Sequence, residues 1–449
     1  NALQGEVDSI LDVPGGASIE GIIGKRGEVD AYRWRANRGE VWAIDADAGA
    51  GSTLDPFVAI FDSKNQPVLR TRLQAVRDSY FTFRGKDSKQ IGDFRLFNWQ
   101  NMQLNDFLYA AGEVTRLWMY PRGPDSGYNV YPNEGDRWTY FGTSHTTHAL
   151  GEPAYVVRPL APGDKHVANG LPVFDLYYEN DDDPARMVGK NSRLLFKAPQ
   201  DGIYTVRISD TRGDGGEKFG YSLAIRPASP SFKPSVVKPN AEIRRGSGRE
   251  VVLRVDRLDG FDGAVTFELK NLPEGLVSSF PVTVENGQRY ALGNIWASES
   301  AEPWEDASAP KVIARAMVLG RMVEQQVGDL GILKLGEEPN VVPSIQPLDR
   351  MVDVAEDWTL QVRRGHSVAA RVVVRRKEGF VGQVSFGKEN AGRNAPHGVY
   401  VDNIGLNGLL VRQGEDERGF VLTADPVAKL GKRAFFLRGE VDGNITTHE

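Results

Sequence analysis

The sequence predicts an all-β protein, and three observations lead to this class. The 449-residue chain contains 49 glycines and 25 prolines, which break it at intervals of about ten residues. Between these breaks, valine, isoleucine, tyrosine and phenylalanine alternate with polar residues, as in strands that bury one face. Long segments with the 3.6-residue period of an amphipathic helix are missing. Short strands at this spacing are typical of stacked β-sandwiches.

The first 75 residues predict four strands. Short apolar or alternating runs occur at residues 19–23, 32–34, 41–44 and 57–61. Both faces of the last run are apolar, so we expect that strand in the centre of a sheet.

Residues 194–226 give the clearest strand pattern of the chain. Period-2 alternation at 204–208 and 221–225 predicts two strands, preceded by a shorter alternating run at 194–197. The intervening DTRGDGG at 210–216 predicts a turn, because glycine and aspartate favour turn conformations. We expect the strands on either side of this turn to form a hairpin at the closing edge of a β-sandwich.

The same residues carry a family resemblance. The pattern F-x-A-P-x-D-G-x-Y-x-V-x-I-x-D, followed by G-Y-S-L-x-I, resembles the end of the bacterial pre-peptidase C-terminal (PPC) domain. Residues 19–62 resemble its beginning, so the resemblance covers about residues 5–75 and 175–227. It implies a jelly-roll β-sandwich over residues 1–227, with residues 76–177 as an insertion.

The insertion is rich in aromatic residues and is divided by turn signals, which predicts a folded β-rich subdomain rather than a disordered linker. Tryptophan and tyrosine rings on β-structure can stack on sugar rings or on proline-rich and collagen-like ligands. The alternative is that these rings form the subdomain's own core. The candidate ligand-binding residues are Trp99, Trp118, Tyr120, Tyr128, Tyr131, Trp138 and Tyr140.

An internal repeat occupies the C-terminal half. GFDG at 260–263 matches GFVG at 379–382, and PEGL at 273–276 matches PHGV at 396–399. A strand, a tight turn and a second strand at this repeat length indicate immunoglobulin-like sandwiches. The copies resemble the tandem modules that follow PPC domains in large secreted bacterial proteins. The expected domains are therefore 1–227, 228–345 and 346–449, with a proline-rich linker at 228–240.

Two acidic regions are candidate metal sites. The run at 181–183 could supply the carboxylate oxygens that Ca²⁺ prefers. The PPC resemblance implies further carboxylates before and within the first strands. The candidate calcium ligands are Glu6, Asp8, Glu28, Asp30, Asp181 and Asp182. Turn caps and a solvated acidic loop are the alternative, and Asp210, Asp214 and Glu217 fit a turn better than a metal site.

The histidine pair His145 and His148 is a further candidate, with Asp136 and Glu152 nearby as zinc ligands. The pair lies in a Gly/Ser/Thr-rich segment and lacks the glutamate of H-E-x-x-H. Structural histidines are therefore the favoured interpretation.

Composition excludes several function classes. A net charge of −6 argues against a nucleic-acid surface. The chain has no cysteine, which excludes disulfides, thiolate zinc sites and thiol nucleophiles. There is no G-x-S-x-G motif of a serine hydrolase and no apolar run long enough to span a membrane. Because the sequence begins Asn1-Ala2-Leu3, we expect a processed form or a piece of a longer chain.

We therefore expect a non-catalytic binding, targeting or adhesion module outside the cytoplasm, in the extracellular or periplasmic space or on a bacterial cell surface. Its partners would be polysaccharide or extracellular protein, other domains of a longer chain or other subunits, and Ca²⁺ without an organic cofactor. One alternative is a spacer or assembly subunit of a surface layer or large complex. The other is a glycan-active enzyme with two facing carboxylates in the insertion.

Overall fold

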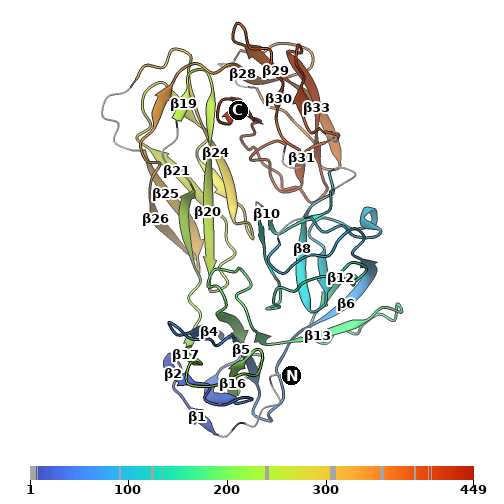
Figure 1. The fold of residues 1–449 in the computed structure, drawn as a ribbon, viewed down its shortest axis with the longest axis vertical. Helices are drawn as coiled ribbons and strands as arrows, with labels where there is room; N and C mark the ends of the chain where they lie inside the picture. The colour runs from blue at the N-terminus through green and yellow to red at the C-terminus, as the bar shows by residue number, and fades with distance from the viewer. Residues whose placement is uncertain are drawn as a thin grey trace. The chain divides into compact units, whose positions relative to one another are not determined.

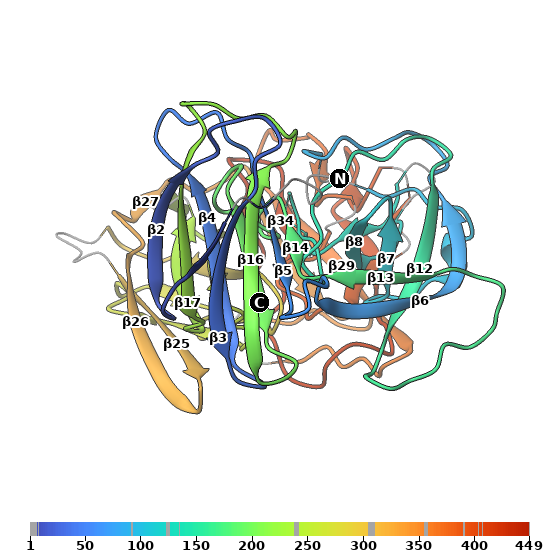
Figure 2. The ribbon, with the colours of Figure 1, turned by 90° about the horizontal axis from the view of Figure 1, so that it is seen from below.

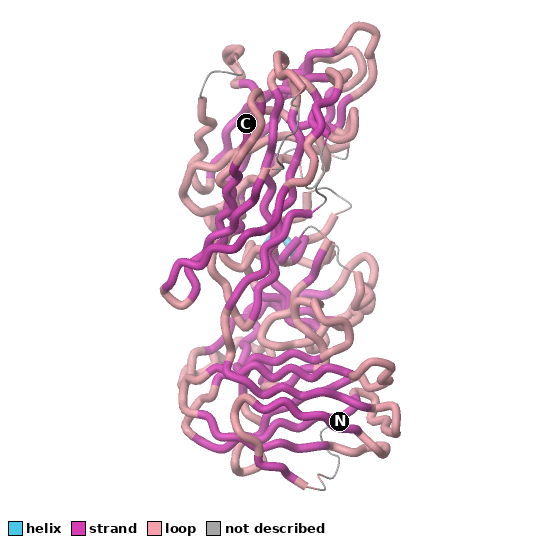
Figure 3. The backbone as a smooth tube through the Cα atoms, turned by 90° about the vertical axis from the view of Figure 1, so that its left-hand side faces the viewer, coloured by secondary structure: helices cyan, strands magenta, loops and turns pink. Residues whose placement is uncertain are grey.

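The computed structural model describes residues 7, 9–90, 93–122, 126–133, 135–237, 242–303, 310–353, 358–388, 391–402, 404–405 and 407–448. The regular elements of these residues are β-strands and one short 3-10 helix, η2 (Trp99–Asn101) (Figure 3). The predicted all-β class is confirmed. The chain divides into two compact units, Asn1–Trp118 with Tyr128–Ser229, and Met119–Gly127 with Pro230–Glu449.

The first unit contains a β-sandwich of two sheets. One sheet has the strand order β1-β3-β16-β5-β14 and the other has the order β15-β4-β17-β2. Figure 2 shows β3, β16 and β5 side by side, with β2, β17 and β4 beside one another in the second sheet. The strands are β1 (Ile10–Asp12), β2 (Ala17–Ile22), β3 (Asp30–Ala36), β4 (Val41–Ala48), β5 (Pro56–Phe61), β14 (Glu179–Asn180), β15 (Ser192–Lys197), β16 (Gly202–Asp210) and β17 (Gly220–Pro227).

Alternation of side chains along these strands builds the sandwich core. Trp34 of β3, Phe196 of β15 and Tyr204 of β16 are buried, and their rings contact one another at angles between 43° and 81°. Aromatic pairs prefer such inclined contacts because of the ring quadrupole. The sequence expectation of strands at 32–34, 41–44 and 57–61 is confirmed by β3, β4 and β5.

The expected hairpin at 204–225 is wrong. Strand β16 pairs with β3 and β5, whereas β17 pairs with β4 and β2, so the turn at 211–219 carries the chain from one sheet to the other. Alternation shows that a strand has two faces but does not identify its neighbours. The crossing needs a glycine, since a Cβ on Gly215 would lie 2.2 Å from the carbonyl oxygen of Lys25.

The insertion forms a sheet of its own, with the order β13-β6-β12-β7-β8-β9 (Figure 1). This sheet has a small hydrophobic core of Leu73, Ala75, Val114 and Val157. Half-buried side chains, most of them aromatic, pack against this core. The strands are β6 (Leu69–Tyr80), β7 (Phe107–Ala110), β8 (Glu113–Met119), β9 (Asn129–Val130), β12 (Pro153–Leu160) and β13 (Val173–Tyr177), with the separate pair β10 (Pro132–Asn133) and β11 (Asp136–Arg137).

The second unit contains two hydrophobic cores, one built from residues between 232 and 335 and the other from residues between 341 and 445. Sheets of order β22-β24-β20-β35-β34 and β23-β21-β25-β26 enclose the first core, with β18 added to β20. The second core lies against the sheet β28-β29-β33-β31 and the pair β30-β32. The small pair β19-β27 completes the topology.

The strands of the second unit are β18 (Ser231–Val237), β19 (Glu242–Arg244), β20 (Gly248–Leu258), β21 (Val265–Lys270), β22 (Leu276–Ser278), β23 (Val282–Val284), β24 (Tyr290–Ala297), β25 (Lys311–Val318), β26 (Arg321–Asp329), β27 (Lys334–Gly336), β28 (Val341–Gln346), β29 (His366–Arg376), β30 (Val384–Ser385), β31 (Val399–Asp402), β32 (Leu410–Val411), β33 (Glu417–Ala424), β34 (Arg438–Gly439) and β35 (Ile445–Thr446).

The internal repeat has matching structure in both copies. Arg257, at the end of β20, donates from Nη1 to the carbonyl oxygen of Gly263, and Arg376, at the end of β29, donates from Nη1 to that of Gly382. Each guanidinium also lies beside the phenylalanine of its own Gly-Phe-x-Gly turn. The repeated sequence therefore produces the same contact in both copies: an arginine at the end of a strand donates a hydrogen bond to the following turn.

The two copies are joined by hydrogen bonds and buried charge. Strand β35, near the C-terminus, pairs with β20 of the first copy. Glu250 of β20 accepts from Arg393 at 2.6 and 3.0 Å and from Arg438 at 2.9 Å. The copies thus share one sheet within one compact unit, and their division into separate domains at 345 stays a prediction.

Candidate functional site

The exposed aromatic side chains of the described residues all lie in one short part of the insertion. They are Tyr80 (41% exposed), Phe83 (60%), Phe97 (43%) and Trp99 (36%). Folded proteins usually bury rings of this size, so a group of exposed rings marks a candidate binding surface. We call these four residues the aromatic ledge.

Pairing between the end of β6 and residues 94–97 creates the ledge. Phe81 and Leu96 form an antiparallel bridge, and both side chains are buried. Because side chains alternate across a strand, the neighbouring Tyr80 and Phe97 point outward. Their rings stack with centroids 4.8 Å apart and 16° between the planes.

Charged groups lie directly beside the rings. The guanidinium of Arg95 lies over the Phe83 ring, 4.1 Å from its centroid, and its Nε donates to Asp93 Oδ2 at 3.1 Å. Lys86 Nζ donates to the other oxygen of Asp93 at 2.9 Å. The ledge therefore combines flat apolar faces with a fixed cation and a fixed carboxylate.

Trp99 is held by a buried tyrosine. It begins the 3-10 helix η2, whose preceding residue Asn98 adopts a left-handed conformation with φ of 51°. The Tyr128 hydroxyl donates to the carbonyl oxygens of Trp99 at 3.0 Å and of Met102 at 3.2 Å. Tyr128 is completely buried, so it fixes the backbone beneath Trp99 while the indole stays at the surface.

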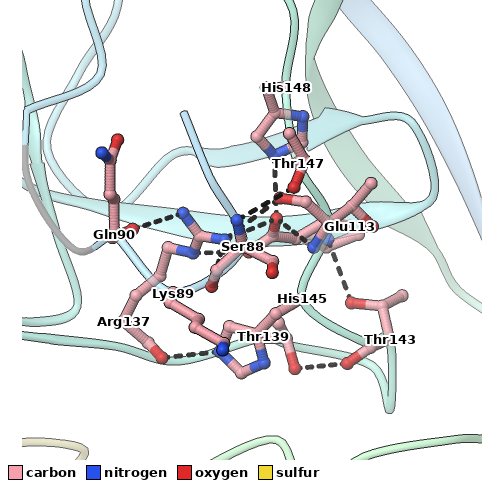
Figure 4. A network of polar contacts seen from close by, with 12 residues as sticks. Ser88, Lys89, Gln90, Glu113, Arg137, Thr139, Thr143, His145, Thr147 and His148 are labelled. Carbon is pink, nitrogen blue, oxygen red and sulfur yellow. Dashed lines mark hydrogen bonds and ion pairs between the residues drawn. The ribbon is translucent and has the colours of Figure 1, made fainter. Parts of the chain in front are cut away.

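A buried polar network lies beneath this part of the insertion (Figure 4). Its centre is Glu113, at the start of β8. Glu113 Oε2 accepts from His148 Nε2 at 2.8 Å and from the Thr146 amide at 3.0 Å, and Oε1 lies 2.9 Å from Arg137 Nε. Glu113, Arg137 and His148 are each only about 1% exposed, so they are out of reach of a substrate.

Arg137 binds the surrounding loops through backbone carbonyls. Its guanidinium donates to Gln90 O at 2.7 Å, Ser88 O at 3.1 Å and Thr146 O at 3.2 Å, and burial lowers its pKa. The Arg137 carbonyl oxygen in turn lies 2.7 Å from His145 Nε2. Burial lowers the pKa of His145 to about 4, so at neutral pH its Nε2 carries the single proton and donates it.

His148 links this network to the ledge. Its ring stacks on Phe81 with centroids 4.9 Å apart and 12° between planes, and it meets Phe94 edge-on at 5.9 Å. Phe81 is the buried chain neighbour of Tyr80, and Phe94, which meets Phe81 edge-on, is buried as well. Both histidines of H-T-T-H thus contact other protein groups, and the described residues contain no group of three or more ligands able to hold a metal ion.

The remaining candidate aromatics are less exposed than Trp99. Tyr131 is buried, and its hydroxyl donates to Asn105 Oδ1 at 2.6 Å. Tyr140 is half-buried against Phe107 at 5.3 Å. Trp118 and Trp138 are half-buried as well. A ligand-binding role for these residues stays a prediction.

Tyr120 belongs to the second unit rather than to the sheet of the insertion. Its hydroxyl donates to Asp425 Oδ2 at 3.0 Å, and its ring meets that of Tyr400 at 6.4 Å. Its role in binding also stays a prediction.

In the first group of candidate calcium ligands, Glu28 and Asp30 each accept a hydrogen bond from the protein itself. Glu6 and Asp8 lie outside the described residues. Glu28 Oε2 accepts from the Lys25 amide at 2.8 Å, which caps a turn. Asp30 accepts from the Tyr221 hydroxyl between the two sheets of the sandwich. Burial, together with Asp30, raises the pKa of Tyr221, so this phenol stays protonated.

The second group of candidate calcium ligands, Asp181 and Asp182, follows β14 at one end of the five-stranded sheet, where β14 pairs with β5. Burial, together with the neighbouring charges of Asp181 and Asp55, raises the pKa of Asp182 to about 6. Burial likewise raises the pKa of Asp55 and of Glu179. These carboxylates repel one another, and an oxygen-binding cation would relieve that repulsion.

Asp210 has a different role at the same end. It is fully buried and caps the DTRGDGG turn, because its Oδ2 accepts from the Arg212 and Asp214 amides at 3.0 and 3.2 Å. Its Oδ1 accepts from the Asp55 amide at 2.9 Å. The turn interpretation of this acidic segment is therefore confirmed for Asp210.

Sequence reasoning identified Trp99 but missed Tyr80, Phe83 and Phe97 as surface residues. Tyr80, Phe81 and Phe83 stand close together in one aromatic segment of the insertion. Which face of this segment points outward depends on pairing with residues 94–97, and local sequence does not encode that pairing.

Comparisons with known proteins identify no family. No protein-family model matches the chain, and a search of curated proteins gives no match. Among solved structures, the chain is similar to "surface layer protein SbsC, domains 4-9" with a TM-score of 0.21 and 11% identity. That match covers 77% of this chain and 48% of the other, so the chain spans about half the length of that structure. Within the described residues, no helix has the length and apolar character needed to cross a membrane.

Proposed function

We propose that this protein is a non-catalytic binding module outside the cytoplasm that holds polysaccharide on the aromatic ledge. The observation that carries the proposal is the stacked pair of Tyr80 and Phe97, exposed beside Trp99 and Phe83. Under this proposal the PPC-like sandwich is the scaffold and its insertion provides the binding surface.

Sugar rings suit this surface chemically. A pyranose ring has apolar C–H faces and a rim of hydroxyl groups, so it can stack on an aromatic face while its edge forms hydrogen bonds. Arg95 and Asp93 supply a donor and an acceptor at the edge of the rings, and each is held by ion pairs. Groups held in place before binding lose little conformational entropy on binding.

The buried network supports this proposal by keeping the ledge rigid. His148 stacks on Phe81, and Glu113 accepts a hydrogen bond from His148. The chain neighbours of Phe81 are Tyr80, which is exposed, and Thr82, whose hydroxyl donates to the Arg95 carbonyl oxygen. A rigid, preformed surface is what a binding module needs in order to recognise repeated units of a polymer.

Co-sedimentation with insoluble polysaccharide tests the proposal. Wild-type protein is mixed with cellulose, chitin or peptidoglycan sacculi, and the bound fraction is compared with that of a Tyr80→Ala/Phe97→Ala variant. Binding that depends on the two rings supports the proposal. The absence of binding to all three polymers would remove it.

Assembly through the second unit is a second candidate function, favoured by one specific observation. The hairpin of β25 and β26 carries exposed Met317, Leu319 and Met322 at and beside its turn, and Leu319 is 80% exposed. Exposed apolar tips of this kind suit contact with another protein chain. Light scattering over a range of concentrations, with Leu319→Ser as the variant, tests whether this tip drives self-association.

We also propose Ca²⁺ as the ion for the carboxylates of Asp181 and Asp182. The all-oxygen donor chemistry and the mutual repulsion of these groups support a hard cation. Glu28 and Asp30 do not carry this proposal, and in each of them one carboxylate oxygen accepts a hydrogen bond from the protein itself.

A further inference from the structure

A cavity of about 790 Å³ lies in the first unit between the start of β6, the loop at 160–164 and the end of β15. Its charged lining is mostly positive, since Arg38, Arg70, Arg72 and Lys197 face a single carboxylate, Asp164. Cavities of roughly 300–1,000 Å³ accommodate small organic molecules. The excess of positive charge favours an anionic one.

Arg70 enters this cavity because of an irregularity in strand pairing. Residues Leu69 and Thr71 of β6 pair with Tyr177 and Leu176 of β13, so Arg70 is the extra residue of a β-bulge. A bulge redirects the side chain that it carries. The guanidinium of Arg70 lies over the Tyr178 ring, 5.2 Å from its centroid.

Arg70 has no carboxylate counterion among the described residues. Its Nη1 is buried without a hydrogen-bond partner, and it lies so close to Gly142 that a Cβ there would be 2.2 Å from it. Among the described residues, no carboxylate oxygen lies within ion-pair distance of Arg70. By contrast, Asp175 holds Arg72, two residues along the strand, at 2.5 and 2.7 Å. A buried charge without a counterion is costly, and burial accordingly lowers the pKa of Arg70.

The rim adds further positive charge. Arg38 and Lys197 are both exposed at the edge of the cavity. Asp164, whose Oδ2 accepts from the Ala161 amide at 3.1 Å, is the single negative charge of the lining. An anion that entered would therefore meet more positive than negative charge, with Arg70, Arg38 and Lys197 among the cations.

We propose that this cavity is a binding site for a small organic anion of sugar-acid size, whose oxyanion group pairs with Arg70. The planar fork of a guanidinium matches a carboxylate, sulfate or phosphate with two parallel hydrogen bonds. The volume exceeds the needs of a bare ion, so the oxyanion is carried on a larger molecule. This site is independent of the aromatic ledge, which lies further along the insertion.

Isothermal titration calorimetry of the purified full chain tests the site with four probes: glucuronate, glucose 6-sulfate, neutral glucose and sodium sulfate. We expect glucuronate or glucose 6-sulfate to bind at least tenfold more tightly than either glucose or sodium sulfate. The carboxylate and sulfate arms distinguish which oxyanion fits better. Equal binding of glucose would overturn the electrostatic argument, and equal binding of sodium sulfate would overturn the assignment of an organic ligand.

Variants assign the binding to Arg70. Arg70→Gln removes the charge and should abolish binding, while unfolding at a higher denaturant concentration than wild type because a buried charge is gone. Arg70→Lys keeps the positive charge but loses the two parallel N–H donors of the guanidinium, so this variant should bind at least tenfold more weakly. It replaces Arg70→Gln if that variant fails to fold. Arg35→Gln, a matched exposed arginine of β3, should bind as wild type does. Unchanged binding in both Arg70 variants would refute the proposal.

Discussion

His148 stacks on Phe81 with ring centroids 4.9 Å apart while its Nε2 lies 2.8 Å from Glu113 Oε2. One imidazole thus connects a buried ionic network to the buried neighbour of the exposed Tyr80. Three predictions follow these contacts from the interior to the surface, and two concern the carboxylates at the end of the sandwich.

Glu113 should be critical for stability. In Glu113→Gln the buried guanidinium of Arg137 loses its carboxylate, and breaking a buried pair in this way costs about 3–5 kcal/mol. Urea unfolding measures the loss. Glu152→Gln is the control, because Glu152 is partly exposed and lies 3.5 Å from His148, and it should cost less than about 1 kcal/mol. A Glu113→Gln protein as stable as wild type would show that the network contributes little.

His145 should make stability fall in mild acid. Its pKa is about 4 in the folded state against an ordinary 6.5, so the folded protein resists protonation of this ring. The associated stability is complete above pH 6.5 and is lost as the pH falls toward 4. The advantage of wild type over His145→Gln should shrink by about 2 kcal/mol between pH 6.5 and 5. Urea unfolding at both pH values checks this, and an NMR titration of the imidazole with a midpoint near 6.5 would contradict it.

Asp182 should destabilise the protein at neutral pH. Its pKa of about 6 lies above the ordinary 3.8, so the cost of ionising it is fully present above pH 6 and vanishes below 3.8. Asp182→Asn should therefore raise the Tm at pH 7.5 and leave it unchanged at pH 3.8. Asp78→Asn, on an exposed part of β6, is the control and should change neither value. A lower Tm for Asp182→Asn at pH 7.5 would refute this interpretation of the acidic end.

If Ca²⁺ binds at Asp181 and Asp182, it should offset the free-energy cost of ionising Asp182. Adding 1 mM Ca²⁺ at pH 7.5 should raise the Tm of wild type, because a ligand that binds only the folded state stabilises it. The same addition should leave Asp182→Asn unchanged. Equal Tm shifts in both proteins would place the ion elsewhere, and no shift in either would remove calcium from the account.

The fold was predictable from the sequence where local pattern determines it. The alternation around Tyr32 and Trp34 gave β3, and the repeated Gly-Phe-x-Gly turns gave matching devices around Arg257 and Arg376. Strand partners were not predictable, because β16 and β17 flank one short turn and yet join different sheets. Their neighbours come from distant residues, and alternation carries no information about them.

The candidate sites show the same limit. Composition predicted a binding surface in the aromatic insertion but not its residues, because Tyr128 and Tyr131 are buried while Tyr80 and Phe97 are exposed. Which face of a strand meets solvent depends on pairing across the insertion. Arg70 is harder still to find, because its direction follows from a bulge whose opposite strand lies a hundred residues away.

The most direct test of the central claim is the affinity of the Tyr80→Ala/Phe97→Ala variant for whichever of cellulose, chitin and peptidoglycan the wild-type protein binds, measured by co-sedimentation across a range of polymer concentrations. Stacking is worth about 1 kcal/mol per ring, so the variant should bind at least tenfold more weakly. Leu150→Ala, which removes an exposed apolar side chain outside the ledge, should bind as wild type does. Equal affinity of wild type and the double variant would contradict the claim that the aromatic ledge holds polysaccharide.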